Sequence, residues 1–372
     1  MREVVKAAIE AAVVGQAEVG KAAAGTVRKG KGSEDRQIWA RWNLEGRSEC
    51  SQAGQQRGQA EKQLSQCGQA ERQLGQHGQA LGQNISLPFN KYSWLTTHNS
   101  FAILGEPSMT GVPRLTFENQ DDTVTSQLNN GVRGLMLDMY DYLDDVWLCH
   151  SFGGTCYDYT AFQPAISTLQ EIEKFLSSNP SEIVTIFIED YVHAPNGLTK
   201  VFAAAGLMKY WFPLAKMPKN GQDWPTVIEM VTNDERLLVF TSIPSKEAVE
   251  GIAYEWNFVV ENEYGSAGMS SGQCTNRAES PPLNSTSESL VLENYFPDVP
   301  SEMEACTANS KALLDMLKVC YSASGKRWSN FVAVDFYKRS DGGGAFQAID
   351  TLNGNLLCGC GDVHECQVLE RL

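Results

Sequence analysis

The chain has 372 residues, 42% of them hydrophobic, so it is long enough to bury a large core. The first 84 residues carry 12 basic and 9 acidic residues, which leaves 18 of the 30 basic and 36 of the 45 acidic residues for the remainder. A domain this acidic lacks the basic footprint that nucleic acid requires and gains nothing from the field of an anionic membrane. Any recognition of a phosphate group must therefore be local, inside a site.

The N-terminal 84 residues differ in composition from the rest of the chain. They are rich in Ala, Gly, Gln and charge, and the stretch "GQAEKQLSQCGQAERQLGQHGQALGQ" repeats a ten-residue unit with Cys67 and His77 in equivalent positions. Such a composition buries too little apolar surface to offset chain entropy. It predicts that residues 1–84 are a low-complexity segment, disordered or loosely helical, or else a spurious extension. The folded domain is expected over residues 85–372.

Cysteine usage points to an oxidising compartment. Eight of the ten cysteines follow residue 85, scattered and without paired C-x-x-C spacing, which favours disulfides over zinc. Glycosylation sequons at Asn84 and Asn284 agree with a secretory route, so a secreted or extracellular location is expected. No signal peptide is visible, because Glu10, Glu18 and Lys21 interrupt the apolar stretches of the N-terminus. No run of ~18 apolar residues exists, so no transmembrane segment is expected.

From Leu87 onward, short β-rich runs alternate with helical patterns. The expected strands are 92–98, 132–140, 145–152, 182–191, 236–243, 255–264 and 330–337, and the expected helices are 121–131, 165–180, 197–206, 226–234, 310–321 and 344–352. This alternation predicts an α/β fold, a single distorted TIM-like (β/α)8 barrel. A doubly wound sheet is the alternative, but no G-x-G-x-x-G turn follows any strand.

Polar residues follow several of these strands. His98 and Asn99 end the first, and His150 ends the third; the others carry Asp138, Glu189 with Asp190, and Asp335. In a barrel the carboxyl ends of the strands share one face, where the chemistry is expected. Two imidazoles that face each other across this mouth are the groups that a general base and general acid pair requires.

Four segments in this order, "LTTHNSFAI", "GVRGLMLDMYDY", "DVWLCHSF" and "EIVTIFIEDY", resemble the X domain of phosphatidylinositol-specific phospholipases C. The closest likeness is to plant X-domain-containing proteins that lack the C2 and EF-hand modules. The resemblance covers residues 87–366, including "VAVDFYKRSDGGGA", and nothing in 1–84. It implies a phosphoric diester hydrolase or lyase that acts on phosphatidylinositol-type lipids at a membrane surface.

The resemblance also implies roles for individual residues. His98 corresponds to the base that deprotonates the inositol 2-hydroxyl, and His150 to the acid that protonates the departing diacylglycerol oxygen. The product would be a cyclic inositol phosphate. Asp335 corresponds to the residue that orients the base. Glu261 and Tyr264 are the candidates for inositol contacts, and Lys246 is a third candidate for binding the substrate.

The sequence allows the predicted site to be either metal-dependent or metal-free. Calcium-dependent members of the family use an Asn, two acidic residues on the second strand and a Glu, and this chain offers Asn99, Asp138 and Glu189. These oxygens suit Ca²⁺, but Met136 replaces the fourth ligand with a thioether that hard cations avoid. The site is therefore either a Ca²⁺ site of reduced affinity or a metal-free site served by another cation, such as Lys246 or Arg236.

Other readings compete with this one. A glycerophosphodiester phosphodiesterase would share the barrel, but that family usually carries His-Arg-Gly at the first strand and Glu-x-Asp at the second. A catalytically inactive lipid- or glycan-binding barrel would explain Met136. Asp138 has a purely structural alternative as an ion-pair partner of Arg133 or Lys338, and Cys149 has one as the disulfide partner of Cys156.

Overall fold

The computed structural model describes residues 86–366, so the calls on residues 1–84, including the Asn84 sequon, lie outside the described residues. Asn284, the other sequon, is exposed. Within this part no helix is long and apolar enough to cross a membrane.

Eight parallel strands form a curled sheet in the order β7-β6-β5-β2-β1-β10-β9-β8. Their bounds are β1 Trp94–Thr97, β2 Gly134–Tyr142, β5 Val184–Tyr191, β6 Leu237–Thr241, β7 Ala253–Tyr254, β8 Val259–Glu261, β9 Leu290–Tyr295 and β10 Phe331–Val334. In the described part of the chain no ladder joins β7 to β8, two very short strands. The predicted distorted barrel is confirmed, with a seam between these two strands.

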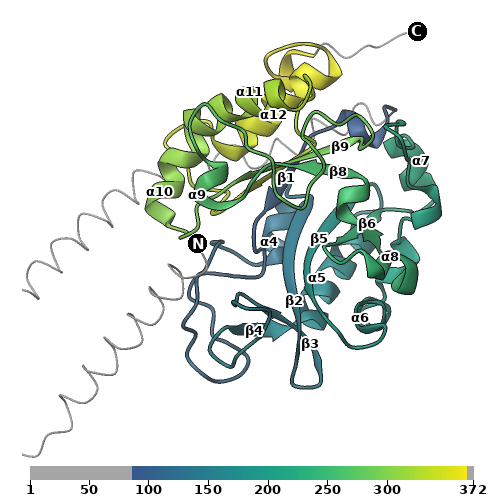
Figure 1. The fold of residues 1–372 in the computed structure, drawn as a ribbon, viewed down its shortest axis with the longest axis vertical. Helices are drawn as coiled ribbons and strands as arrows, with labels where there is room; N and C mark the ends of the chain where they lie inside the picture. Colours follow the sequence, from purple (N-terminus) through teal and green to yellow (C-terminus); the bar gives the residue numbers. More distant parts are fainter. Residues whose placement is uncertain (1–85, 367–372) are drawn as a thin grey trace, which may run out of the picture. The chain divides into compact units, whose positions relative to one another are not determined.

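Helices follow most of the strands and cover the outside of the sheet (Figure 1). They are α4 Val124–Asn129, α5 Ala165–Ser178, α6 Gly197–Ala204, α7 Val227–Thr232, α8 Ser245–Glu250, α9 Gly265–Gly268, α10 Glu302–Thr307, α11 Leu313–Ala323 and α12 Gly344–Leu357. The longest of these, α5 and α12, have apolar stripes that pack on the strands, as amphipathic helices do.

Successive residues of each strand point to opposite faces, and this alternation divides the core in two. Leu135 and Leu137 of β2 belong to the layer beneath the helices. Phe187, Phe240 and Phe331 meet in the barrel interior, where Phe187 packs edge-on against Phe331 with ring centroids 5.0 Å apart. These aromatic side chains fill the barrel interior and lie beneath the polar residues at the carboxyl ends of the strands.

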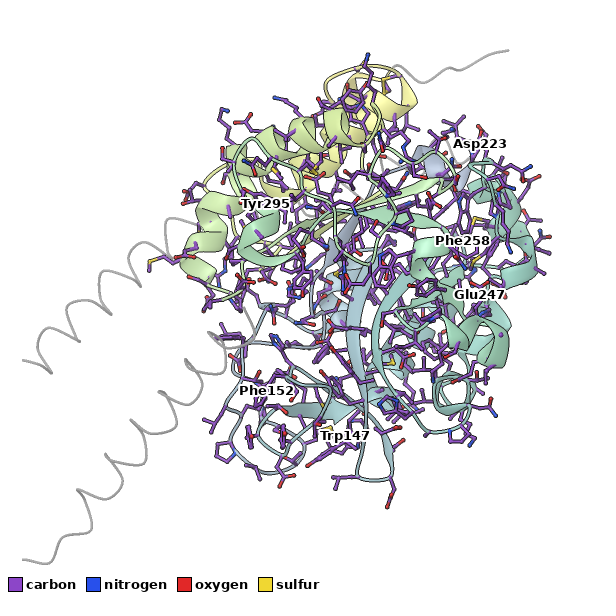
Figure 2. The ribbon with its side chains drawn as sticks, in the orientation of Figure 1. Trp147, Phe152, Asp223, Glu247, Phe258 and Tyr295 are labelled. Atoms are coloured by element: carbon purple, nitrogen blue, oxygen red, sulfur yellow. A yellow bond between two sulfur atoms is a disulfide. The ribbon has the colours of Figure 1, made fainter. Side chains whose placement is uncertain are left out.

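The expected third strand does not belong to the barrel. β3 (Asp145–Cys149) pairs antiparallel with β2, and β4 (Ala161–Pro164) pairs antiparallel with β3. Figure 2 shows Trp147 and Phe152 at the end where this hairpin extends from the barrel. Because β2 is nine residues long, it continues past the mouth, and β3 runs back toward it. His150 thus follows a returning strand rather than the carboxyl end of a barrel strand.

Strand β9 was absent from the expected elements. Its sequence, "LVLENY", is buried throughout, but Glu293 and Asn294 interrupt the apolar run that identifies a central strand. Both side chains are 1% exposed. The tertiary structure accommodates them because Ser329 donates to Glu293 at 2.6 Å and Asn294 donates to Glu261 at 2.8 Å.

Candidate active site

A histidine and an aspartate from neighbouring strands form the centre of the site. β1 and β10 pair in parallel with Thr97 opposite Val334, so the residues that follow, His98 and Asp335, emerge side by side. His98 Nδ1 lies 2.9 Å from Asp335 Oδ1. Asp335 is 3% exposed, whereas His98 keeps 20% of its side chain accessible. The buried carboxylate thus fixes Nδ1 and leaves Nε2 as the ring nitrogen available to other partners.

Two residues that the sequence did not single out hold this pair in place. Asn119, fully buried, donates from Nδ2 to Asp335 Oδ1 at 2.9 Å. Phe296, which follows β9, stacks on the imidazole of His98 with ring centroids 3.6 Å apart and planes 6° apart. The Asp335 contact sets the direction of the imidazole, and the Phe296 contact sets its plane. Neither residue lies in a motif, so only their spatial positions reveal them.

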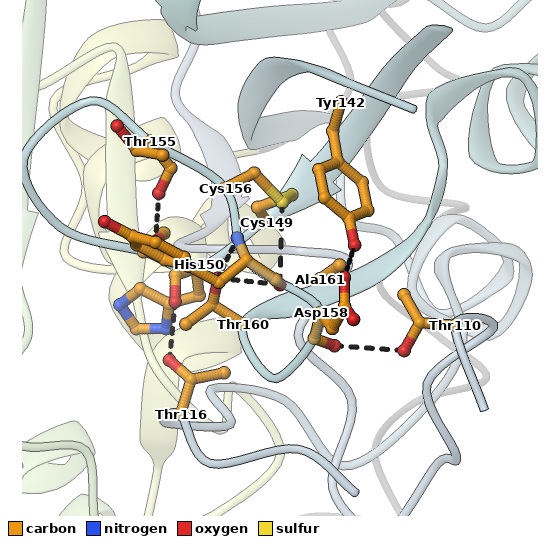
Figure 3. Close-up of a disulfide and its surroundings, with 12 residues drawn as sticks. Thr110, Thr116, Tyr142, Cys149, His150, Thr155, Cys156, Asp158, Thr160 and Ala161 are labelled. Atoms are coloured by element: carbon orange, nitrogen blue, oxygen red, sulfur yellow. Dashed lines mark hydrogen bonds between the residues drawn. A yellow bond between two sulfur atoms is a disulfide. The ribbon is translucent and has the colours of Figure 1, made fainter. Parts of the chain in front are cut away.

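The β2–β3 hairpin and its flanking loops hold His150 (Figure 3). Its backbone N–H donates to Thr160 O at 3.1 Å, its carbonyl accepts from Thr116 Oγ1 at 2.5 Å, and its Nδ1 lies 3.1 Å from Phe117 O. The disulfide between Cys149 and Cys156 closes the loop that follows, as the sequence alternative allowed. Contacts of both its backbone and its side chain therefore hold His150 in a defined position.

Burial, followed by the charge of His98, lowers the pKa of His150 to about 4. A positive charge on His98 disfavours a second positive charge on His150. His150 is accordingly neutral at pH 7 in the protein without ligand. A phosphate anion beside it would raise its pKa and favour the protonated form.

The three expected metal ligands also come together. Asp138 and Glu189 are register partners on β2 and β5 and line the same pocket, together with Met136. When the Asn99 amide is oriented to satisfy both neighbours, its nitrogen donates to Asp138 Oδ1 at 3.0 Å, and its oxygen lies 3.2 Å from His98 Nε2. Burial, then repulsion by Glu189, raises the pKa of Asp138 well above its ordinary value. A cation between these oxygens would relieve that repulsion, so the donor set fits Ca²⁺, with the Met136 thioether as its weak point.

The two candidates for an alternative cation, Lys246 and Arg236, lie outside the pocket lining. Lys246 on α8 does not line the pocket, because its ammonium binds Glu250 at 2.6 Å and is buried there. Arg236 precedes the first residue of β6, at the amino end of the barrel, where it donates to the carbonyls of Leu176 and Glu182. The structure therefore places neither side chain in the lining of this pocket.

The structural alternative for Asp138 does not hold either. Arg133 pairs with Glu182 at 2.7 Å, and Lys338 pairs with Asp122 at 3.2 Å. Asp138 thus has neither of the ion-pair partners considered for it, and its carboxylate faces the pocket.

The cation that does line the pocket is Arg277, from the long loop between β8 and β9. Its Nη1 binds Glu261 Oε1 at 3.1 Å, and its guanidinium lies over the rings of Trp256 and Tyr264, 5.1 and 4.8 Å from their centroids. Glu261 and Tyr264 therefore lie at the pocket as expected, and Glu261 is 1% exposed. No sequence signal marked Arg277, because its loop has no periodic pattern.

The pocket encloses about 600 Å³ of space, the solvent at its mouth included. Its lining residues are His98, Met136, Asp138, Phe187, Ile188, Glu189, Ser242, Glu255, Trp256, Glu261, Tyr264, Arg277, Asn294 and Phe296. Of the two histidines, His98 belongs to this lining and His150 does not. The arrangement places a histidine, an acidic cluster and a guanidinium around one concave surface.

Two bacterial phosphatidylinositol-specific phospholipases C, from Listeria monocytogenes and Staphylococcus aureus, superpose with a TM-score of 0.47 each, at 14% and 12% identity. The superpositions cover 73% of this chain and 95% and 94% of those chains.

Sequence relatives are closer. A PI-PLC X domain-containing protein of Arabidopsis thaliana is 59% identical over 281 residues, which cover 76% of this chain and 66% of that protein, slightly less than two thirds of its length. PI-PLC X domain-containing protein 1 of Arthroderma benhamiae is 27% identical over 69% of this chain and 86% of its own. The PI-PLC X family model matches residues 89–353. The chain thus belongs to the PI-PLC X domain family.

Proposed function

We propose that this protein cleaves the phosphodiester of phosphatidylinositol-type lipids by general base and general acid catalysis. The observation that supports this most directly is the His98–Asp335 pair at the mouth of the pocket. A base oriented by a buried carboxylate, beside a second imidazole, is the set of groups that transfer of a phosphoryl group to a hydroxyl requires.

The proposed reaction is an intramolecular displacement. His98 Nε2 exchanges its contact with Asn99 for the inositol 2-hydroxyl and takes its proton. The 2-oxygen forms a bond to phosphorus, and the bond from phosphorus to the glycerol oxygen breaks. His150 gives its proton to that oxygen, so diacylglycerol leaves and a cyclic inositol phosphate remains. The nucleophile and the phosphorus belong to one molecule, so positioning alone contributes much of the acceleration.

His150 must be protonated for its step, although its pKa is about 4 in the protein without ligand. The phosphodiester anion supplies the compensating charge when it binds, and it also displaces water from the site. The general acid is thus prepared by its own substrate, so its proton is present when the leaving group needs it.

Asn99, Asp138 and Glu189 would hold a Ca²⁺ ion at one side of the pocket. When bound, such an ion neutralises charge that develops on the phosphoryl oxygens. Asp138 and Glu189 supply carboxylates from the ends of two neighbouring strands, and Asn99 would turn its amide so that its oxygen, rather than the nitrogen that donates to Asp138, reaches the ion.

Lipid substrates reside in a bilayer, and one loop beside His150 suits contact with it. Leu104, Met109, Val112 and Leu115 are 40%, 61%, 37% and 39% exposed. The loop is tied to the hairpin by Met109 N–H to Phe162 O and by Leu115 N–H to Tyr159 O. Exposed apolar side chains on an otherwise acidic domain support contact with lipid rather than with a charged surface.

The three described disulfides support a secreted protein.

Hydrolysis of phosphatidylinositol in mixed micelles tests the proposal. The wild type should release inositol phosphates, and His98→Ala should abolish the release. His193→Ala is the matched control, because His193 is an exposed histidine outside the pocket and its loss should leave the rate unchanged. Equal background rates for wild type and His98→Ala would refute the enzyme and favour an inactive binding barrel. Release from glycerophosphoinositol but not from the lipid would favour a glycerophosphodiesterase.

Chelation separates the metal-dependent from the metal-free form of the mechanism. With Ca²⁺ in the site, activity should fall with chelator and return with added Ca²⁺. Met136→Glu would restore a fourth oxygen ligand and should lower the Ca²⁺ concentration that gives half-maximal activity. Activity that neither chelator nor Ca²⁺ changes would remove the metal from the mechanism.

A further inference from the structure

A second concave surface lies beside the loop between β8 and β9. This groove encloses about 660 Å³ of space, the open solvent in front of it included. Pro282, Leu283 and Asn284 of the loop line the groove together with Ala323, the last residue of α11. None of its lining residues belongs to the pocket that His98 lines, so the groove is a separate feature of the molecule.

Asn284 lies in a tight turn at the edge of this groove. The backbone N–H of Ser285 donates to Pro282 O at 2.7 Å, which closes a β-turn with Asn284 at its third position. Asn284 is exposed, and within residues 86–366 no hydrogen bond or ion pair holds its side chain. The amide can therefore carry a substituent without losing a contact inside the folded domain.

The backbone of the turn is held from its inner side. The guanidinium of Arg327 donates to Leu283 O at 2.8 Å and to Ser285 O at 2.6 Å, so it binds the carbonyls on both sides of Asn284. Leu283 is 6% exposed and packs with one valine each of β8 and β9. A fixed backbone beneath an exposed side chain keeps Asn284 in a constant position relative to the groove.

The lining of the groove has mixed polarity. Pro282 and Ala323 are apolar, whereas Asn276 is polar and exposed. The first sugar of an N-linked glycan, N-acetylglucosamine, has apolar ring faces and polar edges. A groove that offers both kinds of partner next to Asn284 suits this sugar.

The groove also adjoins the segment of the loop that reaches the candidate active site. Asn276 Nδ2 donates to Arg277 O at 2.6 Å and to Ser280 O at 3.0 Å. Arg277 lines the pocket of His98, and Asn276 lines the groove. A sugar in the groove would thus contact the same segment that carries Arg277 and would restrict its motion.

From these observations we infer that Asn284 carries an N-linked glycan whose first N-acetylglucosamine lies in the groove and stabilises the β8–β9 loop. Asn284, Ser285 and Thr286 form the acceptor sequence Asn-x-Ser/Thr, and Thr286 is exposed as well. Such glycans are attached in the secretory pathway, the route that the disulfides support. The inference concerns a surface outside the candidate active site and does not depend on cleavage of a lipid.

Occupancy of Asn284 is tested on the full chain, secreted from a eukaryotic host behind a cleavable signal peptide. Asn84→Gln leaves Asn284 in the only acceptor sequence of the chain. Peptide-N-glycosidase in heavy-oxygen water should then turn Asn284 into a labelled aspartate, which mass spectrometry locates. Thr286→Ala should abolish the label, and Thr286→Ser, which keeps the acceptor hydroxyl, should retain it. An unmodified Asn284, whether the chain is secreted or held in the cell, would overturn the inference.

Stepwise trimming of high-mannose glycans tests where the sugar lies. Endoglycosidase H leaves one N-acetylglucosamine on Asn284, whereas peptide-N-glycosidase removes the whole glycan. We expect the trimmed protein to keep its Tm and complete removal to lower Tm by at least about 2 °C. Thr286→Ala, which never acquires the glycan, should show the same lower Tm and controls for the aspartate that the enzyme creates.

A variant that fills the groove separates a sugar in the groove from a glycan that only extends into solvent. Ala323→Trp leaves the acceptor sequence intact, so the glycan should still be attached. Because the indole takes the place of the sugar, complete removal of the glycan should no longer change Tm. Equal Tm of all glycan forms in the parent protein, or a difference that persists in Ala323→Trp, would overturn the placement in the groove.

Discussion

The imidazole of His98 lies flat against the phenyl ring of Phe296, with centroids 3.6 Å apart and planes 6° apart. Phe296 is 5% exposed and follows directly after the end of β9, two strands away from β1. The phenyl ring of Phe296 therefore restricts the rotation of the His98 imidazole out of its plane. Together with Asp335, it leaves His98 one orientation in which Nε2 faces the pocket.

Replacing Phe296 should therefore impair catalysis more than binding. In Phe296→Leu the imidazole regains freedom, and we expect kcat to fall about tenfold or more with little change in KM, because the misplacement affects the reacting atom. Phe296→Tyr keeps the aromatic face and should retain most of the rate. Steady-state kinetics on micellar substrate measure both. A Leu variant as fast as the wild type would show that the stack is only packing.

Asp335 and Asn119 should behave as one unit. Asp335→Asn removes the acceptor that fixes His98 Nδ1, and kcat should fall by about 10²–10⁴. Asn119→Ala leaves the carboxylate in place but loses its 2.9 Å hydrogen bond, so we expect a smaller loss. Because both act through the same imidazole, the double variant should be little slower than Asp335→Asn. Additive losses would mean that Asn119 acts independently of Asp335.

Two disulfides with nearly equal loops allow a matched test of how His150 is positioned. Cys149–Cys156 spans 7 residues and adjoins His150, whereas Cys358–Cys366 spans 8 residues near the end of the described chain. Removing either by paired Cys→Ser substitutions should cost a similar ~2–3 kcal/mol of unfolding free energy. Only the first pair should also lower kcat.

Denaturant titration and kinetics on the same samples separate these two effects. Equal losses of kcat in both disulfide variants, each still folded, would contradict a local role for Cys149–Cys156.

Glu293 predicts a pH dependence of stability that is independent of catalysis. Burial raises its pKa from 4.5 to about 7, against a hydrogen bond from Ser329 that lowers it. The folded state therefore favours the protonated carboxyl. Its contribution to stability is fully present below pH 4.5 and is lost as the pH rises through about 7, on the order of 3 kcal/mol in all.

Glu293→Gln removes the titration and should flatten this part of the profile. Urea unfolding at pH 5 and pH 8 gives the two free energies for each protein. If the wild type and the Gln variant lose stability equally between these pH values, another group is responsible.

The sequence by itself determined the elements that rest on local patterns. Alternating strands and amphipathic helices indicated the barrel, and His98, Asp138, Glu189 and Asp335 stood out because polar residues ended or interrupted apolar runs. The motif order pointed to the family. These signals can be read from the sequence because periodicity and strand ends are properties of neighbouring residues.

Only the tertiary structure decided how the remaining groups meet. The antiparallel return of β3 sets the position of His150, and a loop without any pattern brings Arg277 into the pocket. Pairing with Glu250 removes Lys246 from the site, although its position in the chain suggested a role. Such outcomes depend on contacts between residues far apart in sequence, whose energies no local pattern encodes.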